Sequence, residues 1–489
     1  MLNDFWSSLA SHFSWILVAI YVFTILSTAA MIIHEKRDPA KTSTWVLLLI
    51  VLPVFGLVLY IFFGQTYRKQ KIFSRKEIQD LEQIKYLDHL RVGRFKTNKV
   101  INEKLHKYHH NITLLQNNSK ALLTENNDIE IYHEGEFAFE AIIEELYAAK
   151  DSIHIEFYII NNDNIGNRIK NILITKVKEG VTVRVIFDDV GSWHLPKSYI
   201  KELRNAGVEI GPFMEVKFPL LTSKVNYRNH RKIVVIDGKV AFMGGMNIAD
   251  RYIEGDRKLG KWFDIMLRFH GEAVHSLQVI FLADWYFVTG KVLKDKQRYF
   301  KKIEVDNLLP LQIITSGPDS DWAGIMQAFF YAITRASNYI YISSPYFIPN
   351  ESILTALKTA ALSGVDVRII LPQHSDSTVV YWSSMSFVTE LLEAGIKIYL
   401  FKTGFNHSKL MVIDGSFASV GSANMDIRSF EDNFEVAAII YDDSVASRLE
   451  KLYLDFTKNS DQVTLETWRK RSLKNSYKEA FARLISPLF

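Results

Sequence analysis

Two stretches of the chain, residues 229–247 and 406–424, repeat one spaced set of polar residues. Both read H-x-K-x4-D-x6-G-[GS]-x-N, so each supplies an imidazole, an ammonium, a carboxylate and a carboxamide. A histidine can attack phosphorus or move a proton, while ammonium and amide groups can hold phosphate oxygens. The set therefore suits chemistry on a phosphate ester, and its repetition argues against an ordinary polar strand edge.

Each stretch is predicted to be a β-hairpin, because two short apolar runs flank an Asp-Gly pair. If Asp237 and Gly238 are the two turn residues, His230 lies opposite Gly245. A glycine there would let a substrate approach the backbone closely.

The second copy predicts the same arrangement, with His407 opposite Ser422. A hydroxyl is therefore available beside one histidine and absent beside the other. Asn247 and Asn424 come two residues after Gly245 and Ser422, and their side chains are neutral hydrogen-bond donors. We expect Asn247, Asn424 and Ser422, together with Gly245, to contribute to phosphate binding.

Two histidines indicate a two-step mechanism, in which one forms a phosphohistidine and the other acts as general acid and base. The residues that complete the predicted catalytic set are Lys232, Lys409, Asp237 and Asp414. Aspartate in a turn commonly bonds to nearby backbone, so a structural role for the two aspartates is favoured even within this set.

A catalytic histidine needs a partner that orients its second nitrogen. Each half offers one carboxylate downstream of its histidine, Asp264 after 34 residues and Glu435 after 28. Both open an apolar, strand-like run, and we expect them to orient the histidines.

The bulk composition narrows the function. The chain has 489 residues, no cysteine and a net charge of +4. Thiolate catalysis and cysteine-based zinc sites are excluded, and no metal-ligand spacing is present. We expect neither a metal nor an organic cofactor, and the modest charge does not favour a nucleic-acid partner.

Two uncharged runs, residues 14–33 and 44–63, are each long enough to cross a bilayer as a helix. They predict a membrane hairpin within residues 1–66. Five basic residues follow the second run and three lie in the link between the runs, which favours a cytoplasmic body at the cell (inner) membrane. These residues are Arg68, Lys69, Lys71, Arg75 and Lys76, against Lys36, Arg37 and Lys41.

The rest of the chain predicts an α/β fold built from two similar halves. Residues 67–120 are a polar linker, and strand-like runs alternate with helical spacing after it. Segments near 152–160, 181–189 and 206–213 match those near 339–349, 364–372 and 394–401. We therefore predict homologous halves at 121–300 and 301–489, packed with pseudo-two-fold symmetry so that equivalent surfaces meet at one site.

The duplicated motif resembles that of the phospholipase D superfamily. Residues 35–64, 421–435 and 483–489 look like those of bacterial cardiolipin synthases, and the resemblance covers nearly the whole chain. It implies transfer of a phosphatidyl group between two phosphatidylglycerol molecules, giving cardiolipin and glycerol. It also implies that His230 is the nucleophile and His407 the acid and base, with anionic membrane lipid as partner.

Other functions fit the same motif. Water in place of the second lipid would give a phospholipase, and another alcohol would give a different phosphatidyltransferase. A nuclease-type phosphodiesterase would need a basic groove, and an inactive membrane scaffold is disfavoured because both motifs are intact. A homo-oligomer is left open.

Overall fold

The computed structural model describes residues 15, 19, 21–23, 25–30, 39–52, 56, 60, 105–216, 226–293 and 296–486. The chain divides into two compact units, one containing residues 1–74 and the other containing residues 75–216 and 227–487. Each unit is described by itself.

The first unit contains helix α2 (Pro39–Val51). Trp45 and Leu49 are buried there with Tyr60, whose ring meets the Trp45 ring edge-on at 5.6 Å. Nine residues of each predicted span, 14–33 and 44–63, lie outside the described residues. Within the part of the chain that is described, no helix combines the length and the apolar character needed to cross a membrane.

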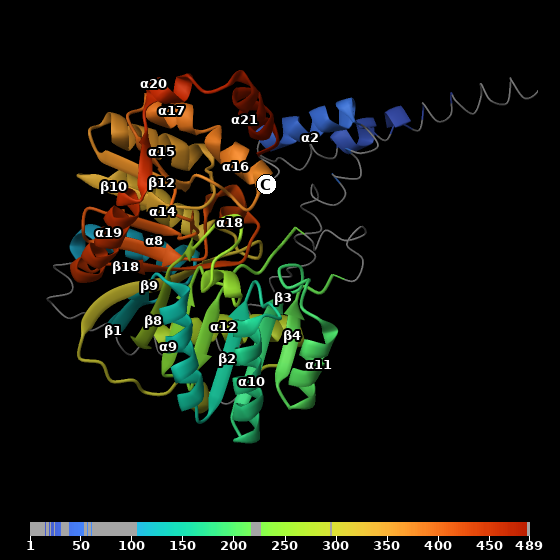
Figure 1. The fold of residues 1–489 in the computed structure, drawn as a ribbon, viewed down its shortest axis with the longest axis vertical. Coiled ribbons are helices and arrows are strands. Elements are labelled where there is room, and N and C mark those ends of the chain that lie inside the picture. Colours follow the sequence, from blue (N-terminus) through green and yellow to red (C-terminus); the bar gives the residue numbers. More distant parts are fainter. Residues whose placement is uncertain are drawn as a thin grey trace, which may run out of the picture. The chain divides into compact units, whose positions relative to one another are not determined.

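The described part of the second unit is built on a 15-stranded sheet in which two strand sets mirror each other (Figure 1). From the centre outward, one set reads β1 (Leu123–Tyr132), β8 (Met266–Gly271), β6 (Val240–Gly244), β5 (Ile233–Ile236), β2 (Ser152–Phe157), β3 (Thr182–Asp188) and β4 (Glu209–Phe213). The other reads β9 (Leu308–Ser316), β18 (Glu435–Ile440), β16 (Phe417–Gly421), β15 (Leu410–Ile413), β10 (Tyr339–Ser343), β12 (Asp366–Pro372) and β13 (Lys397–Phe401), with β19 (Ser460–Val463) added at its edge.

The two sets also agree in strand direction. In both, the first four neighbouring pairs are antiparallel and the next two are parallel. The central pair β1–β9 is antiparallel, with a register shift between Thr124 and Asn126. A single sheet therefore runs through both sets of strands.

The strands form where β-branched residues concentrate. Every residue of β2 is buried, as expected of a strand with neighbours on both sides and covered faces. Helix α10 (Asn164–Lys178) follows, and the Asp163 side chain caps it by accepting from the Gly166 N–H at 3.1 Å. Gly180 lies just beyond the helix with φ +89°, the left-handed conformation expected of a terminating glycine.

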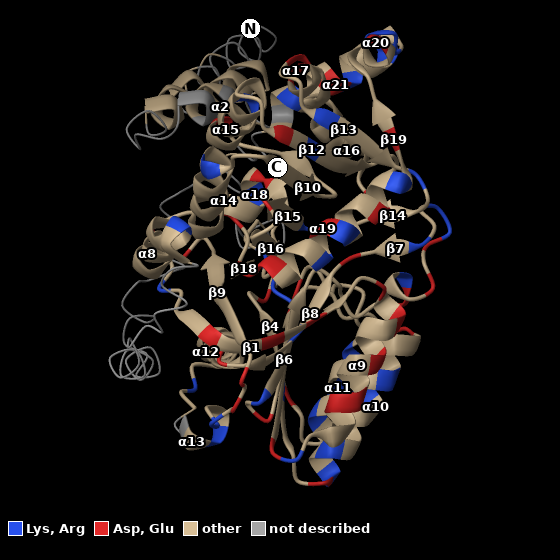
Figure 2. Ribbon diagram, turned by 90° about the vertical axis from the view of Figure 1, so that its left-hand side faces the viewer, with Lys and Arg blue, Asp and Glu red and all other residues tan. Residues whose placement is uncertain are grey.

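Alternate residues of the strands face different helical layers. Val234 and Ile236 join a core with helices α9 (Gly135–Ala148), α10 and α11 (Lys197–Asn205). Ile233 and Val235 join a core that both strand sets share with α12 (Ala273–Thr289) and α19 (Asp443–Lys458). In Figure 2, charged positions run along α9, α10 and α11, whereas the strands are largely uncharged.

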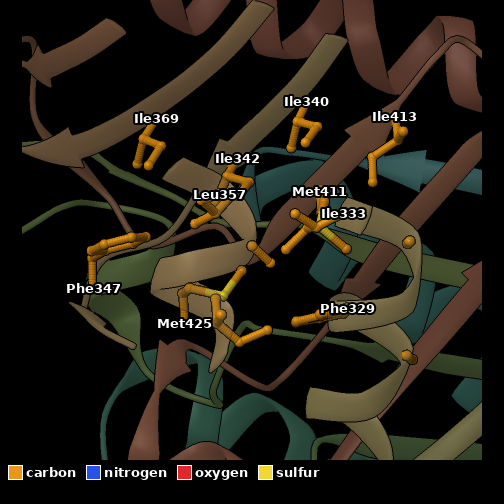
Figure 3. Close-up of a cluster of buried hydrophobic side chains, with 14 of the residues drawn as sticks. Phe329, Ile333, Ile340, Ile342, Phe347, Leu357, Ile369, Met411, Ile413 and Met425 are labelled. Atoms are coloured by element: carbon orange, nitrogen blue, oxygen red, sulfur yellow. The ribbon is translucent and has the colours of Figure 1, made fainter. Parts of the chain in front are cut away.

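The second strand set has its own core under α14 (Gly324–Arg335), α15 (Glu351–Leu362), α16 (Thr378–Met385) and α17 (Val388–Glu393). Figure 3 shows part of it, where strands β10, β12 and β15 meet the helices through Ile340, Ile342, Ile369, Met411, Ile413, Phe329, Ile333 and Leu357. The remaining short elements are η2 (His106–Tyr108), η5 (Asp250–Tyr252), β7 (Trp262–Phe263), α13 (Lys296–Tyr299), β11 (Phe347–Ile348), β14 (Phe405–Asn406), β17 (Met425–Asp426), α18 (Ile427–Glu431), α20 (Leu465–Arg469) and α21 (Leu473–Ile485).

One segment expected in the polar linker is ordered helix. Helix α8 (His109–Asn118) buries Ile112 and Leu115 in the core of the second strand set, against α14. Only residues 105–120 of the predicted linker are described, so the expectation for residues 67–104 is untested.

Both motif hairpins form, but the predicted register is wrong by one residue. Ile236 pairs with Val240, and Ile413 pairs with Phe417. The turn is tightened by the Lys239 N–H, which donates to the Ile236 carbonyl at 3.0 Å and leaves three residues in the loop instead of two. Because a one-residue slip changes every facing pair, the predicted pairings of His230 with Gly245 and of His407 with Ser422 do not form.

Candidate active site

Each motif histidine stands on a short segment that crosses to the other strand set. Strand β14 pairs in parallel with β7, and the His407 N–H donates to the Phe263 carbonyl at 2.7 Å. In the matching place, Asn229 forms a parallel bridge with Phe434, and the His230 N–H donates to the Phe434 carbonyl at 2.9 Å. The backbone therefore carries each histidine to the carboxylate of the opposite half.

The predicted histidine-orienting carboxylates contact the histidines, but in exchanged pairs. His230 Nδ1 lies 3.0 Å from Glu435 Oε1, and His407 Nδ1 lies 2.7 Å from Asp264 Oδ2. Glu435 and Asp264 are buried. The sequence analysis paired each histidine with the carboxylate of its own half, whereas in the fold each histidine contacts the carboxylate of the other half.

The motif lysines lie beside the same histidines. Lys232 Nζ donates to the His230 carbonyl at 2.6 Å and stands 5.4 Å from the centre of the Tyr158 ring. Lys409 Nζ lies 2.8 Å from His407 Nδ1 and 3.5 Å from Asp264 Oδ2. Both lysines are buried, so their charge can act strongly on an anion that enters the site.

Burial changes the proton affinity of the site in opposite directions for cations and anions. It lowers the pKa of His230, and it lowers the pKa of His407 further because Lys409 is adjacent. Burial also lowers the pKa of Lys232 to about 7. Both histidines are therefore held neutral in the free protein.

The two carboxylates are not equivalent. Burial raises the pKa of Asp264 to about 6. Burial also raises the pKa of Glu435, but His230, Lys232 and the Ser422 hydroxyl outweigh it, so that the pKa lies below its usual value. Glu435 is thus the more firmly ionised partner, and it belongs to His230.

Gly245 and Ser422 account for part of this difference. The Ser422 hydroxyl donates a short hydrogen bond to Glu435 Oε2. A Cβ atom on Gly245 would lie 2.1 Å from Asp264 Oδ1, so only glycine leaves room for that carboxylate. Both residues therefore support the orienting carboxylates, and their predicted part in phosphate binding stays a prediction.

The two asparagines sit in different surroundings. Asn247 Oδ1 accepts from the Ile159 N–H at 3.1 Å, and its Nδ2 donates to the Tyr252 hydroxyl at 2.9 Å. Asn424 Oδ1 is buried and has no hydrogen-bond partner among the described residues. Asn247 therefore holds the backbone at Ile159 and the side chain of Tyr252 in place. The Oδ1 atom of Asn424 is left without a partner among the described residues.

Asp237 and Asp414 lie at the far ends of their hairpins. Asp237 accepts from the backbone N–H groups of Lys150, Asp151 and Ser152 at 2.8 to 2.9 Å. Asp414 accepts in the same way at 2.7 to 2.8 Å from three successive N–H groups, those of Ser337, Asn338 and Tyr339. Six residues separate each aspartate from its histidine, and its oxygens already accept from backbone N–H groups. A catalytic role for the two aspartates stays a prediction, and this geometry favours the structural role.

Aromatic side chains surround the histidines, and the motif analysis did not include them. The Tyr158 ring meets His230 edge-on at 4.8 Å. Trp262, Phe405 and Tyr346 have ring centres 5.5 to 6.2 Å from that of His407. A signal for Tyr158 and Tyr346 was present, because each lies within three residues of the end of the strand, β2 or β10, that pairs with its motif hairpin.

The chain is similar to known protein families and to solved structures. A family described as "Cardiolipin synthase, PLD-like domain" matches residues 142–285 and again 330–455, and one described as "Phospholipase_D-nuclease N-terminal" matches residues 13–65. The crystal structure of phosphatidylserine synthase from Haemophilus influenzae Rd KW20 superposes with a TM-score of 0.57 at 15% identity, covering 79% of this chain and 97% of that one. At that identity the likeness shows the fold alone, and the class defined by fold and site is a PLD-like protein with two motif copies.

Full-length relatives narrow the class. A cardiolipin synthase of Geobacillus sp. (strain WCH70) is 42% identical over 99% of this chain and 96% of its own length. Cardiolipin synthase 2 of Bacillus anthracis is 42% identical over 94% of this chain and 88% of its own. The chain belongs to the cardiolipin synthase family of PLD-like proteins.

Proposed function

We propose that this protein is a phosphatidyltransferase that joins two phosphatidylglycerol molecules into cardiolipin and releases glycerol. Family membership and the names of its full-length relatives support the reaction. The observation that carries the mechanism is the pair of motif histidines, His407 buried and His230 partly buried, each bound through Nδ1 to a carboxylate of the opposite half. That contact leaves each Nε2 as the nitrogen available for chemistry.

In the first step, His230 Nε2 attacks the phosphorus of one phosphatidylglycerol. The bond between phosphorus and the headgroup glycerol oxygen breaks, and the departing glycerol takes a proton from His407. The low pKa of His230 supports its role as nucleophile, since only the neutral imidazole has a free electron pair. Glu435 stabilises the positive charge that His230 acquires.

In the second step, a glycerol hydroxyl of another phosphatidylglycerol gives its proton to His407 and attacks the phosphohistidine. The phosphorus–nitrogen bond breaks, His230 is restored and cardiolipin leaves. Lys232 and Lys409 are placed to hold the non-bridging oxygens as negative charge builds in both steps.

His407 must carry a proton before it can serve as the acid. In the free protein its Nδ1 lies beside both Lys409 Nζ at 2.8 Å and Asp264 at 2.7 Å. A bound phosphodiester draws Lys409 towards its oxygens, which leaves Asp264 as the partner of Nδ1. His407 therefore takes up its proton together with the substrate.

The proposal extends to the organisation of the chain into domains. Residues 121–300 and 301–489 are homologous PLD-like halves related by pseudo-two-fold symmetry, and residues 1–66 are a hairpin that holds the protein in the cell membrane. The two matches to one family and the mirrored strand orders support the two homologous halves.

The match at residues 13–65 and the two uncharged runs support the membrane hairpin. The excess of basic residues after the second run supports a cytoplasmic body.

A product assay tests the reaction. Purified protein in phosphatidylglycerol vesicles should form cardiolipin and glycerol in equal amounts, and His230→Ala and His407→Ala should form neither. Phosphatidic acid in place of cardiolipin would make the protein a hydrolase. Lipid label should remain on protein denatured in alkali for the wild type and be absent from His230→Ala, which tests the nucleophile.

A further inference from the structure

Helix α21 is attached to the body of the second unit by one face. Ala482 and Glu479 are buried on that face, and the Ala482 carbonyl accepts from the Ser383 hydroxyl of α16 at 3.2 Å. Arg471, just before the helix, forms an ion pair with Glu479 at 2.6 Å. The helix is therefore fixed in rotation about its own axis.

The opposite face carries large apolar side chains in water. Leu473, Tyr477, Phe481 and Leu484 are 77, 75, 67 and 58% exposed. At roughly 100° per residue their spacing keeps them within a stripe about 80° wide. The centre of that stripe points away from Glu479 and Ala482. A monomeric protein in water gains nothing from such a stripe, so it indicates a binding surface.

Basic residues border the stripe. Lys474 and Lys478 are exposed along one side of it, and Lys478 Nζ stands 4.6 Å from the centre of the Trp382 ring of α16. Among the described residues, no carboxylate lies within ion-pair distance of either lysine. Arg469 and Lys470, which precede the helix, do have carboxylate partners, Glu393 and Glu466.

We propose that the exposed face of α21 docks on the surface of an anionic phospholipid bilayer. An apolar stripe with tyrosine within it and lysines at its border is the pattern of a helix that lies in the plane of a membrane. A second copy of this chain is a poorer occupant, because two such faces would bring their lysines together. The choice of anionic lipid rests on the proposed function, whereas the docking face itself does not.

This docking would set the position of the active site relative to the lipid. Helix α21 packs on α16, and α16 begins two residues after Asp376. Asp376 accepts from the Tyr346 hydroxyl at 2.6 Å, and the Tyr346 ring lies against His407. A short chain of contacts thus connects the docking face to the half of the site that activates the second lipid.

The absence of cysteine allows a direct test with the full chain. A single cysteine at Phe481 would carry a fluorophore, and spin-labelled lipid would quench it in vesicles of phosphatidylglycerol. The matched control is a cysteine at Phe137, an aromatic residue 61% exposed on α9. We expect at least threefold stronger quenching at position 481 than at position 137, and weaker quenching at 481 in phosphatidylcholine.

Equal quenching at the two positions would overturn the proposal. So would a label at 481 that is shielded from water without being quenched by lipid, since protein would then cover the face. The measurement does not depend on turnover, so quenching without cardiolipin synthesis would leave the docking intact and reject the proposed function alone.

Paired substitutions give a second test. Tyr477→Ser with Phe481→Ser should lower cardiolipin synthesis on vesicles at least fivefold, with little change on dispersed short-chain phosphatidylglycerol. Phe137→Ser with Tyr147→Ser, which removes two exposed aromatic residues from α9, should change neither rate. Equal losses on vesicles and dispersed lipid would assign α21 a structural role and contradict docking.

Discussion

His230 is held by Glu435, a residue 205 positions later in the chain, through contacts of 3.0 and 3.1 Å from Nδ1 to the two carboxylate oxygens. Asp264 holds His407 through one oxygen, with Oδ2 2.7 Å from Nδ1. Among the described residues, each motif histidine is held by a carboxylate of the other half and by none of its own, so the site exists only when both halves are folded together.

The crossed pairing makes a prediction about Glu435. Glu435→Gln keeps the size of the side chain but removes the charge that stabilises protonated His230, so formation of the phosphohistidine should slow by roughly 10²–10⁴-fold. Rapid-quench trapping of labelled lipid on the enzyme measures this step. An unchanged trapping rate would show that the contact does not assist the nucleophile.

Gly245 and Ser422 should respond unequally to the same substitution. Gly245→Ala places a methyl group where Asp264 lies, so it should lower the turnover rate by about 100-fold through His407. Ser422→Ala removes one hydrogen bond from Glu435, which has other partners, and should cost about 10-fold or less. Steady-state rates on phosphatidylglycerol vesicles compare the two, and the reverse order of losses would contradict this account.

Asp237 should affect stability more than catalysis. Asp237→Asn weakens three hydrogen bonds from backbone N–H groups while tolerating φ near +53°, so the free energy of unfolding should fall by about 1–3 kcal/mol. Turnover per folded molecule should stay within threefold of the wild type. Thermal unfolding and turnover, measured on the same preparation, separate the effects. A large loss of turnover with normal unfolding would restore Asp237 to the catalytic set.

Lys232 should make stability depend on pH. Its folded pKa is about 7, against the ordinary 10.5, so between pH 7 and 10.5 the unfolded state binds more protons and folding stability rises with pH. The slope of the unfolding free energy against pH that Lys232 causes reaches up to about 1.4 kcal/mol per pH unit between these values. Below pH 7 both states are protonated and the slope disappears.

Lys232→Met removes that contribution together with the activity. We expect the difference in unfolding free energy, variant minus wild type, to decrease as pH rises from 7 to 10. Denaturant unfolding across this range measures the slope. A difference that does not change with pH would mean that Lys232 keeps an ordinary pKa.

Substrate binding should be accompanied by proton uptake at His407. Its pKa is depressed in the free protein by burial and by Lys409, and a bound phosphodiester anion raises it. The affinity for a non-hydrolysable phosphonate analogue should therefore fall as pH rises through the pKa of the bound state. Calorimetry in buffers of different ionisation enthalpy counts the protons. His407→Gln should lower the count by the uptake at His407 and leave the uptake at Lys232, whose pKa is about 7 in the free protein.

Local patterns were sufficient to predict most strands and the motif hairpins. The strands in segments 152–160 and 181–189 form within two or three residues of their expected ends, because β-branched residues and flanking turns are local signals. The predicted hairpin register is wrong by one residue because Lys239, which follows the left-handed Asp237 and Gly238, stays outside the ladder and Ile236 pairs with Val240. Helix α8 was missed because a ten-residue, mostly polar helix depends on the core it packs against.

The residues of the site were predictable, whereas their pairing was not. Histidine, lysine and the downstream carboxylates stand out because the chain repeats them. The exchange of Asp264 and Glu435 depends on β7 pairing with β14 and on the bridge between Asn229 and Phe434. These contacts join residues more than 140 positions apart, and no periodicity along the chain records them.

The exchanged carboxylates limit how the two copies can evolve. The two strand sets are also joined in one sheet by the antiparallel pairing of β1 with β9. A duplicated gene usually frees one copy to acquire a new role. Here each copy keeps the other's histidine in place. A substitution near residue 264 therefore affects activity through residue 407, and a substitution near residue 435 affects it through residue 230. The two copies can become chemically different, as aspartate and glutamate already are, but they cannot become independent.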